Sequence, residues 1–325
     1  ENIIFNGKSI SIIGADRENT IIDGGGIGPV ITLTDSVENA NISGFTIRNG
    51  HFEEDINSPD YQRAGGINVG TSISSATTAV LSDLHITNNT GYNGGGIYSA
   101  SGSFFNLSNS IIDENTGSQG GGLHIAGRFI IDSVDIINNV YGVFFYRSQG
   151  VINNSKISNN SPGMFIVGAN YGSEDNWSSP GLIFNNVEIA DNGIESGAEE
   201  QINISASVAM SDMSVVSFNH VTIVLSDTSN NMAAIKAHTG YGVSYPPIYL
   251  YFQNSIIDGH GAGAVYNYAP ENLGELRVTI DYSDIVGGQS AIIDADSLYY
   301  ENNIDEDPQF VDSGNGDYNL SDGSH

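Results

Sequence analysis

The sequence contains no cysteine, so neither a disulfide framework nor thiol chemistry is available to it. Positive charge is also scarce: 9 Lys and Arg stand against 38 Asp and Glu, which gives a formal net charge of -29. Nucleic acid and anionic membrane surfaces are therefore disfavoured partners, and uronate polymers are disfavoured less strongly. We find no apolar run long enough to insert into a membrane and no signal peptide.

Helical periodicity is missing as well, since no stretch of 12 or more residues shows it. Instead, short runs alternate apolar and polar residues and are rich in Ile, Val, Thr and Phe, as in strands. One motif, an inward Ile followed within three residues by Asn or Gly, recurs with a base period of 21 to 28 residues that insertions stretch. Its ten copies are centred on Ile22, Ile47, Ile86, Ile112, Ile136, Ile157, Ile189, Ile223, Ile257 and Ile285.

A period of this length with two or three short strands predicts one coil of a parallel β-helix. The glycine triplets at residues 94–96 and 120–122 are predicted corners of successive coils, because glycine allows positive φ and carries no side chain. The pairs at residues 88–89, 138–139 and 159–160 are Asn-Asn, and we expect them to occupy equivalent turns and to hydrogen-bond between coils. The predicted fold is all-β: a single-domain right-handed parallel β-helix solenoid of about ten coils, with handedness taken from the general rule for parallel crossovers.

Insertions between strands are the places where such a solenoid can carry function, since inward side chains fill the core. We expect loop insertions near residues 51–64, 168–181, 193–200, 238–247 and 269–275, and a closing segment at 305–325. The first insertion gathers four carboxylates that could hold Ca²⁺, although an ordinary solvated loop is favoured: Glu53, Glu54, Asp55 and Asp60. No cofactor is required by the sequence.

Aromatic residues concentrate in the later coils, where they could stack on sugar rings. Alternation places Ile235 and Ala237 inward, so that Lys236 and His238 point outward. By the same argument Tyr266 and Tyr268 point outward, and so do Asp294 and Asp296 if Ile293 and Ala295 are inward. The predicted carbohydrate-binding residues are Trp177, Tyr171, His238, Tyr241, Tyr245, Tyr266, Tyr268, Lys236, Asp294 and Asp296.

A family resemblance rests on the runs "FNGKSISIIGADRENTIIDGG", "ISGFTIRNG", "NGGGIY" and "QGGGLHI" and on the closing "DEDPQFVDSGNGDYNLSDGS". These runs resemble the right-handed parallel β-helix repeat proteins of bacterial surfaces and secretions, of the pectate-lyase-like and polymorphic outer membrane protein types. The resemblance implies a secreted or cell-surface protein and covers nearly the whole chain. Its motifs specify coils rather than chemistry.

The function that we expect is a noncatalytic carbohydrate-binding module for a neutral, xylan-like polysaccharide, within a larger secreted polysaccharide-degrading protein. We expect an extracellular or cell-surface monomer, cut from a longer chain with further domains.

Three alternatives stay open. A glycoside hydrolase could pair Asp294 or Asp296 with Glu271, or Glu174 with Asp212. A polysaccharide lyase could use Lys236, His238, Tyr266 or Arg277. An adhesin would use the solenoid only to project and contact.

Overall fold

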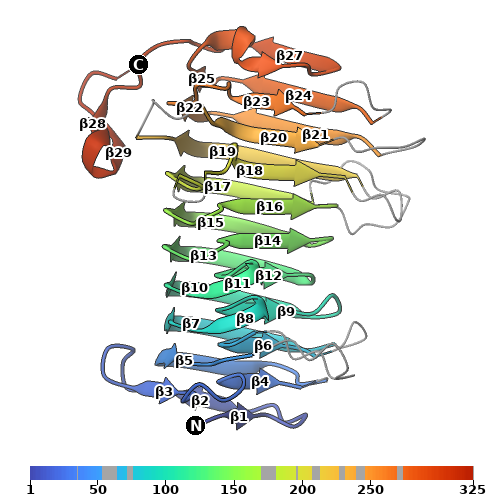
Figure 1. Cartoon of the computed structure of the whole chain (residues 1–325), viewed down its shortest axis with the longest axis vertical. Coiled ribbons are helices and arrows are strands. Elements are labelled where there is room, and N and C mark those ends of the chain that lie inside the picture. The colour runs from blue at the N-terminus through green and yellow to red at the C-terminus, as the bar shows by residue number, and fades with distance from the viewer. Residues whose placement is uncertain are drawn as a thin grey trace. The chain divides into compact units, whose positions relative to one another are not determined.

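The computed structural model describes residues 1–34, 36–52, 64–71, 76–169, 181–194, 197–206, 213–226, 231–238, 246–268 and 274–324. It divides into two compact units, Glu1–Lys156 and Ile157–His325. In each unit parallel strands stack coil upon coil in two sheets, which we call sheet A and sheet B (Figure 1). The fold is therefore the predicted all-β parallel β-helix. All five predicted insertions include residues outside the described ranges.

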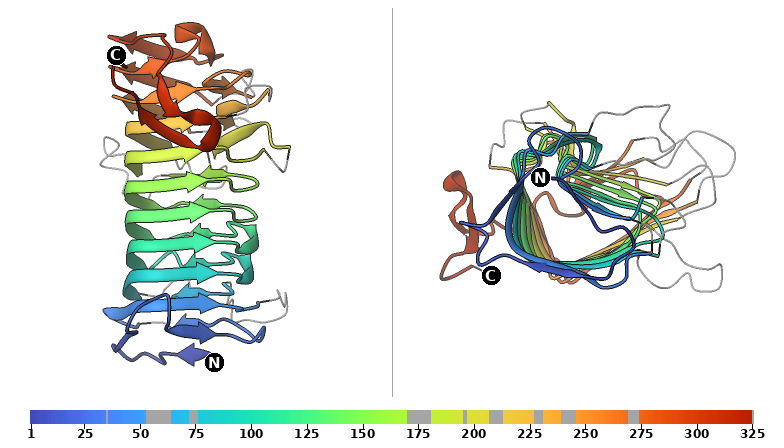
Figure 2. Two further views of the ribbon diagram at one scale, coloured as in Figure 1. Left: turned by 90° about the vertical axis from the view of Figure 1, so that its left-hand side faces the viewer. Right: turned by 90° about the horizontal axis from the view of Figure 1, so that it is seen from below.

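In the first unit, each coil gives one short strand to sheet A and one long strand to sheet B. Viewed from below, the blue to green strands of sheet B overlie one another as one wall of the coil (Figure 2). Sheet A contains β1 (Ile3–Ile4), β4 (Ile31–Leu33), β6 (Ile67–Val69), β9 (Ile97–Ser99), β12 (Leu123–Ile125) and β14 (Val143–Tyr146). Sheet B contains β2 (Ser11–Ile13), β5 (Ala40–Arg48), β7 (Thr78–Thr87), β10 (Phe104–Asp113), β13 (Arg128–Ile137) and β15 (Gln149–Ser158), and β3 (Ile21–Asp23) pairs with β5. A third wall pairs β8 (Thr90–Asn93) with β11 (Thr116–Gln119).

The second unit repeats the same arrangement. Its sheet A contains β16 (Met164–Val167), β18 (Glu200–Ser205), β20 (Ala233–His238), β23 (Val265–Asn267) and β26 (Ile292–Ile293). Its sheet B contains β17 (Leu182–Ala190), β19 (Ser214–Val224), β21 (Ile248–Gln253), β24 (Leu276–Asp281) and β27 (Ser297–Glu301), joined by β22 (Ile256–Asp258) and β25 (Asp284–Ile285). A 3-10 helix, η1 (Gly288–Ala291), precedes β26.

The ten isoleucines predicted from the repeat all lie in the core, and none is more than 8% exposed. Nine of them also stack in register with one another. Neighbouring strands of the first unit pair Ile22 with Ile47, Ile47 with Ile86, Ile86 with Ile112 and Ile112 with Ile136. In the second unit the column is Ile189, Ile223, Ile257 and Ile285. The repeat found in the sequence is therefore the inward column of sheet B.

Gly and Asn form the corners of the coils, as predicted. In each Gly triplet or Asn pair, one residue adopts positive φ and the next is closely packed. Gly94 and Gly120, the first residues of the two triplets, adopt φ of 73° and 67°. A side chain on Gly121, the middle residue, would collide with the backbone oxygen of Val140 in the next coil. In the Asn pairs, the first residue takes positive φ, as Asn88 does at 54°, and the second, such as Asn89, is buried.

The closing segment folds back as an antiparallel hairpin of β28 (Phe310–Asp312) and β29 (Asp317–Leu320), with the 3-10 helix η2 (Ser313–Asn315) at its tip. The hairpin lies outside the coils of the second unit (Figure 2). Phe310 and Tyr318 pack against Ala190 and Val224 at the ends of β17 and β19. The Tyr318 hydroxyl donates to Asp191 Oδ2 at 2.7 Å, which fastens the hairpin to the stack.

Candidate functional site

Lys236 and His238 lie on the outer face of sheet A in the second unit, as alternation along β20 predicts. Ile235 and Ala237 are fully buried, while Lys236 and His238 are partly exposed. In register, Lys236 stands between Asn203 on β18 and Tyr266 on β23. The predicted juxtaposition of Lys236 with Tyr266 is therefore confirmed.

The charge of Lys236 is already neutralised within the protein. Its Nζ lies 2.5 Å from Glu199 Oε2, 3.8 Å from Glu200 Oε2 and 4.1 Å from the centre of the Tyr268 ring. Burial works to lower the Lys236 pKa, but the hydrogen bond that Lys236 donates to Glu199 and the two carboxylate charges outweigh it and raise the pKa. A general base must release its proton near the working pH, so this environment argues against Lys236 as the base of a lyase.

His238 stands beside Tyr268, with ring centres 5.6 Å apart. Burial, and then the charge of Lys236, lower the His238 pKa, so the imidazole is neutral at pH 7. Lys236 and His238 therefore both contact the ring of Tyr268, which stays 45% exposed, and the role of these three residues in sugar binding stays a prediction.

Asp294 and Asp296 are exposed, as predicted, but the predicted alignment of their strand is wrong by one residue. Ile292, not Ile293, is the inward residue of β26, and Ile293 pairs with Tyr266 on the outer face. Asp294 adopts φ of 57°, which ends the strand, and its backbone oxygen accepts a hydrogen bond from Asn267 at 3.1 Å. Asp296 Oδ2 accepts a hydrogen bond from the Leu276 amide at 2.8 Å. The left-handed corner breaks the alternation on which the alignment depended.

Several predicted residues fall outside the described residues, and their roles stay predictions. They are Trp177, Tyr171, Tyr241 and Tyr245 among the aromatics, Glu174, Asp212 and Glu271 among the proposed hydrolytic carboxylates, and Glu53, Glu54, Asp55 and Asp60 of the acidic insertion.

A second outward group, which the sequence argument missed, lies on sheet B of the second unit. Tyr249, Tyr251 and Tyr299 point away from the core, and we call them the tyrosine face. Tyr251 is 40% and Tyr299 47% exposed. Tyr251, Thr279 and Tyr299 pair in register on β21, β24 and β27. The backbone positions of Tyr251 and Tyr299 are therefore two strand spacings apart, about 9.6 Å. The alternation of "IYLYFQ" in the sequence indicates that Tyr249 and Tyr251 point outward.

Beside the tyrosine face runs a column of polar side chains, which we call the polar column. In register it contains Asn185, Asn219, Gln253, Asp281 and Glu301. Asn219 Nδ2 donates to Asn185 Oδ1 at 2.9 Å, and the Tyr299 hydroxyl donates to Glu301 Oε2 at 2.8 Å. Amides and carboxylates thus line up next to exposed rings along one sheet surface.

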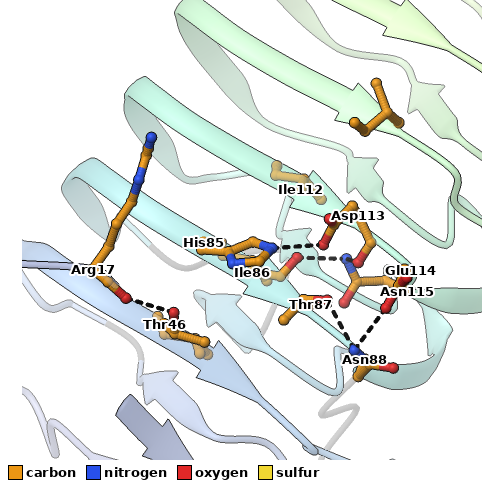
Figure 3. Close-up of polar contacts among 12 residues, drawn as sticks. Arg17, Thr46, His85, Ile86, Thr87, Asn88, Ile112, Asp113, Glu114 and Asn115 are labelled. Atoms are coloured by element: carbon orange, nitrogen blue, oxygen red, sulfur yellow. Dashed lines mark hydrogen bonds and ion pairs between the residues drawn. The ribbon is translucent and has the colours of Figure 1, made fainter. Parts of the chain in front are cut away.

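The first unit contains a different polar cluster, on the outer face of its sheet B (Figure 3). His85 Nε2 on β7 lies 2.8 Å from Asp113 Oδ1 on β10, and this hydrogen bond raises the His85 pKa. Arg17 reaches over the same strands, where its Nη1 donates to the Asn109 backbone oxygen at 2.8 Å and its Nε lies 3.7 Å from Asp83 Oδ1. These contacts join neighbouring coils, and we assign the cluster a structural role.

Within the described residues, no three His, Asp or Glu side chains converge closely enough to hold a metal ion. No helix in the described part of the chain is long and apolar enough to cross a membrane.

Comparison of the chain with protein-family models, with curated proteins and with solved structures found no match.

Proposed function

We propose that the protein is a noncatalytic carbohydrate-binding module that takes a neutral, xylan-like polysaccharide along sheet B of its second unit. The observation that carries this proposal is the register of Tyr251, Thr279 and Tyr299, which puts two exposed tyrosines on the same face of one sheet. We further propose that the module acts outside the cell, as part of a larger polysaccharide-degrading protein.

The chemistry of the two columns suits sugar rings. A pyranose has apolar C–H faces that stack on aromatic rings and equatorial hydroxyls that need hydrogen-bond partners at the edge. The tyrosine face offers rings for stacking. Gln253, Asp281 and Glu301 of the polar column offer hydrogen-bond partners for the hydroxyls. Carboxylates so close to the rings repel a uronate chain, in keeping with the net charge of -29.

A glycoside hydrolase is the second candidate, and one observation favours it: Asp281 and Glu301 are cross-strand neighbours beside the tyrosine face. Two carboxylates close together could act as acid and nucleophile. Asp281 accepts a hydrogen bond from Asn302 and Glu301 accepts one from Tyr299, so each is engaged with a neighbour. Both also project from one side of the same sheet, whereas hydrolysis needs carboxylates that flank the bond. Binding is therefore the better-supported function.

The test is electrophoresis of the purified chain through gels that contain xylan, mannan, mixed-linkage glucan or polygalacturonate. We expect retardation by a neutral polymer, and Tyr251→Ala with Tyr299→Ala should weaken it about 5- to 150-fold, because each ring contact contributes about 0.5–1.5 kcal/mol. Tyr92→Ala is the matched control, since Tyr92 is 38% exposed on β8 of the first unit.

Three results would redirect the proposal. New reducing ends that disappear in Asp281→Asn or Glu301→Gln would establish the hydrolase. Retardation that survives the double Tyr variant would place binding elsewhere on the chain. No retardation by any polymer would favour the adhesin hypothesis.

A further inference from the structure

The second unit contains a pocket of about 310 Å³ where the closing hairpin meets the last coils. Its walls include Asp284 on β25 and, from the hairpin side, Pro308 and Leu320. This volume is at the lower end for small-molecule sites, so the pocket suits a compact ligand. It lies beyond the tyrosine face, since two of its wall residues, Tyr282 and Asn302, directly follow β24 and β27.

Apolar groups make up much of the wall. Ile256, Ile304, Pro308 and Leu320 contribute aliphatic surface, and Tyr282 contributes a ring. Three of these side chains are unusually exposed for their type: Ile304 at 38%, Leu320 at 45% and Tyr282 at 59%. Exposed apolar side chains that converge on one hollow gain free energy when a ligand covers them.

Asp284 is the charged group in this apolar setting. It is only 9% exposed, and its Oδ1 accepts a hydrogen bond from the Glu306 amide at 3.2 Å. The Glu306 amide is the one hydrogen-bond donor to the Asp284 carboxylate among the described residues. Burial raises the Asp284 pKa, and the negative charges of Asp258, Asp305 and Glu306 raise it further.

The protein offers Asp284 no cation from its own unit. After position 156 the sequence contains only two Lys or Arg residues, Lys236 and Arg277. Lys236 pairs with Glu199 and Glu200, and Arg277 pairs with Glu275 at 2.5 Å. A carboxylate in the pocket wall that pairs with no Lys or Arg of its own unit attracts a ligand that brings a positive charge.

We propose that this pocket binds a protonated primary amine carried on a small apolar or sugar frame, with the Asp284 carboxylate as its counter-ion. The ammonium donates to Asp284 Oδ2, while the frame covers the aliphatic wall and the ring of Tyr282. Two sources share this chemistry, an amino sugar such as glucosamine and a lysine side chain. The site is separate from the polysaccharide surface proposed above, and either proposal can fail without the other.

The experiment is calorimetric titration of the full chain at pH 7 with four probes: glucosamine, N-acetylglucosamine, Nα-acetyl-lysine amide and its Nε-acetylated form. We expect at least one free amine to bind and its acetylated partner to bind at least ~30-fold more weakly, because acetylation leaves the buried carboxylate unpaired. The probe that binds identifies the source.

Two variants locate the binding site. Asp284→Asn should weaken amine binding at least ~30-fold while its side-chain oxygen still accepts from the Glu306 amide. Leu320→Ser, on the exposed hairpin wall, should weaken it by a smaller factor without affecting the core. Asp305→Asn is the matched control, because Asp305 carries the same charge nearby but accepts from the Gly287 amide and is not part of the pocket wall.

Equal binding of free and acetylated probes would overturn the proposal, as would no binding of either amine at millimolar concentration. An equal loss in Asp284→Asn and Asp305→Asn would show general attraction to an acidic surface instead of a site, and would also overturn it.

Discussion

Replacement of Asn115 by alanine should be one of the most damaging single changes in the first unit. Asn115 is the middle member of a buried ladder that contains Asn89, Asn115 and Asn139, one residue from each of three successive coils. Its Oδ1 accepts hydrogen bonds from the backbone amide and from Nδ2 of Asn89, both at 3.0 Å. Its Nδ2 donates to the backbone oxygens of Ile86 and Asp113, both at 2.8 Å, and to Asn139 Oδ1 at 3.1 Å.

The size of the effect follows from the groups that lose their partners. Asn115→Ala removes the hydrogen-bond acceptor of the Asn89 backbone amide and one hydrogen-bond donor to the Ile86 backbone oxygen. Both groups are buried. Each buried group left unsatisfied costs about 1–3 kcal/mol, so for these two groups we expect a loss of about 2–6 kcal/mol in the free energy of unfolding. The adjacent Asn88 is exposed, and Asn88→Gly keeps its positive φ, so this control should cost less than about 1 kcal/mol.

Urea unfolding followed by far-ultraviolet circular dichroism measures the two free energies, and hydrogen exchange measures the protection of the Asn89 amide. We expect that amide to lose protection in Asn115→Ala and to keep it in Asn88→Gly. If Asn115→Ala costs no more than Asn88→Gly, the claim that the ladder stabilises the coil stack is refuted.

Two further predictions concern histidines. Burial lowers the pKa of His260 to about 3 while the unfolded chain titrates near 6.5, so its contribution to stability is complete above pH 6.5 and falls toward pH 3. At pH 4.5 the wild type should lose about 2–3 kcal/mol relative to His260→Gln in urea unfolding, and parallel pH profiles would contradict this. Asp113→Asn should lower the pKa of His85 toward its ordinary value in a proton NMR titration, because the hydrogen bond that His85 donates to the Asp113 carboxylate is what raises it. The stability from that pair is present at low pH and is lost as pH rises through the His85 pKa, and an unchanged pKa would show that the contact does not form.

The fold could be predicted because its signals are local. The inward Ile column needs only period-two alternation and a repeat, and both are visible in the sequence. The same alternation predicted the outward direction of Lys236 and His238. It failed in β26, where Ile292 instead of Ile293 points inward and the positive φ of Asp294 ends the strand before the predicted alternation is complete.

The candidate sites were less predictable, because they depend on which outward residues meet. Nothing local shows that Glu199 neutralises Lys236 from 37 positions earlier, or that Tyr251 and Tyr299 share a column across Thr279. These neighbours are set by the lengths of the insertions between strands, and insertions do not follow the repeat.

The sequence by itself determined the coils of this protein, because alternating strands and corners of Gly and Asn act over a few residues. Only the tertiary structure decided where ligands could bind. The closing hairpin places Tyr318 against Asp191, which lies 127 positions earlier in the chain. Together with the last coils, the hairpin forms the pocket around Asp284. Such contacts arise from the burial of surfaces that are distant in sequence, so no local pattern encodes them.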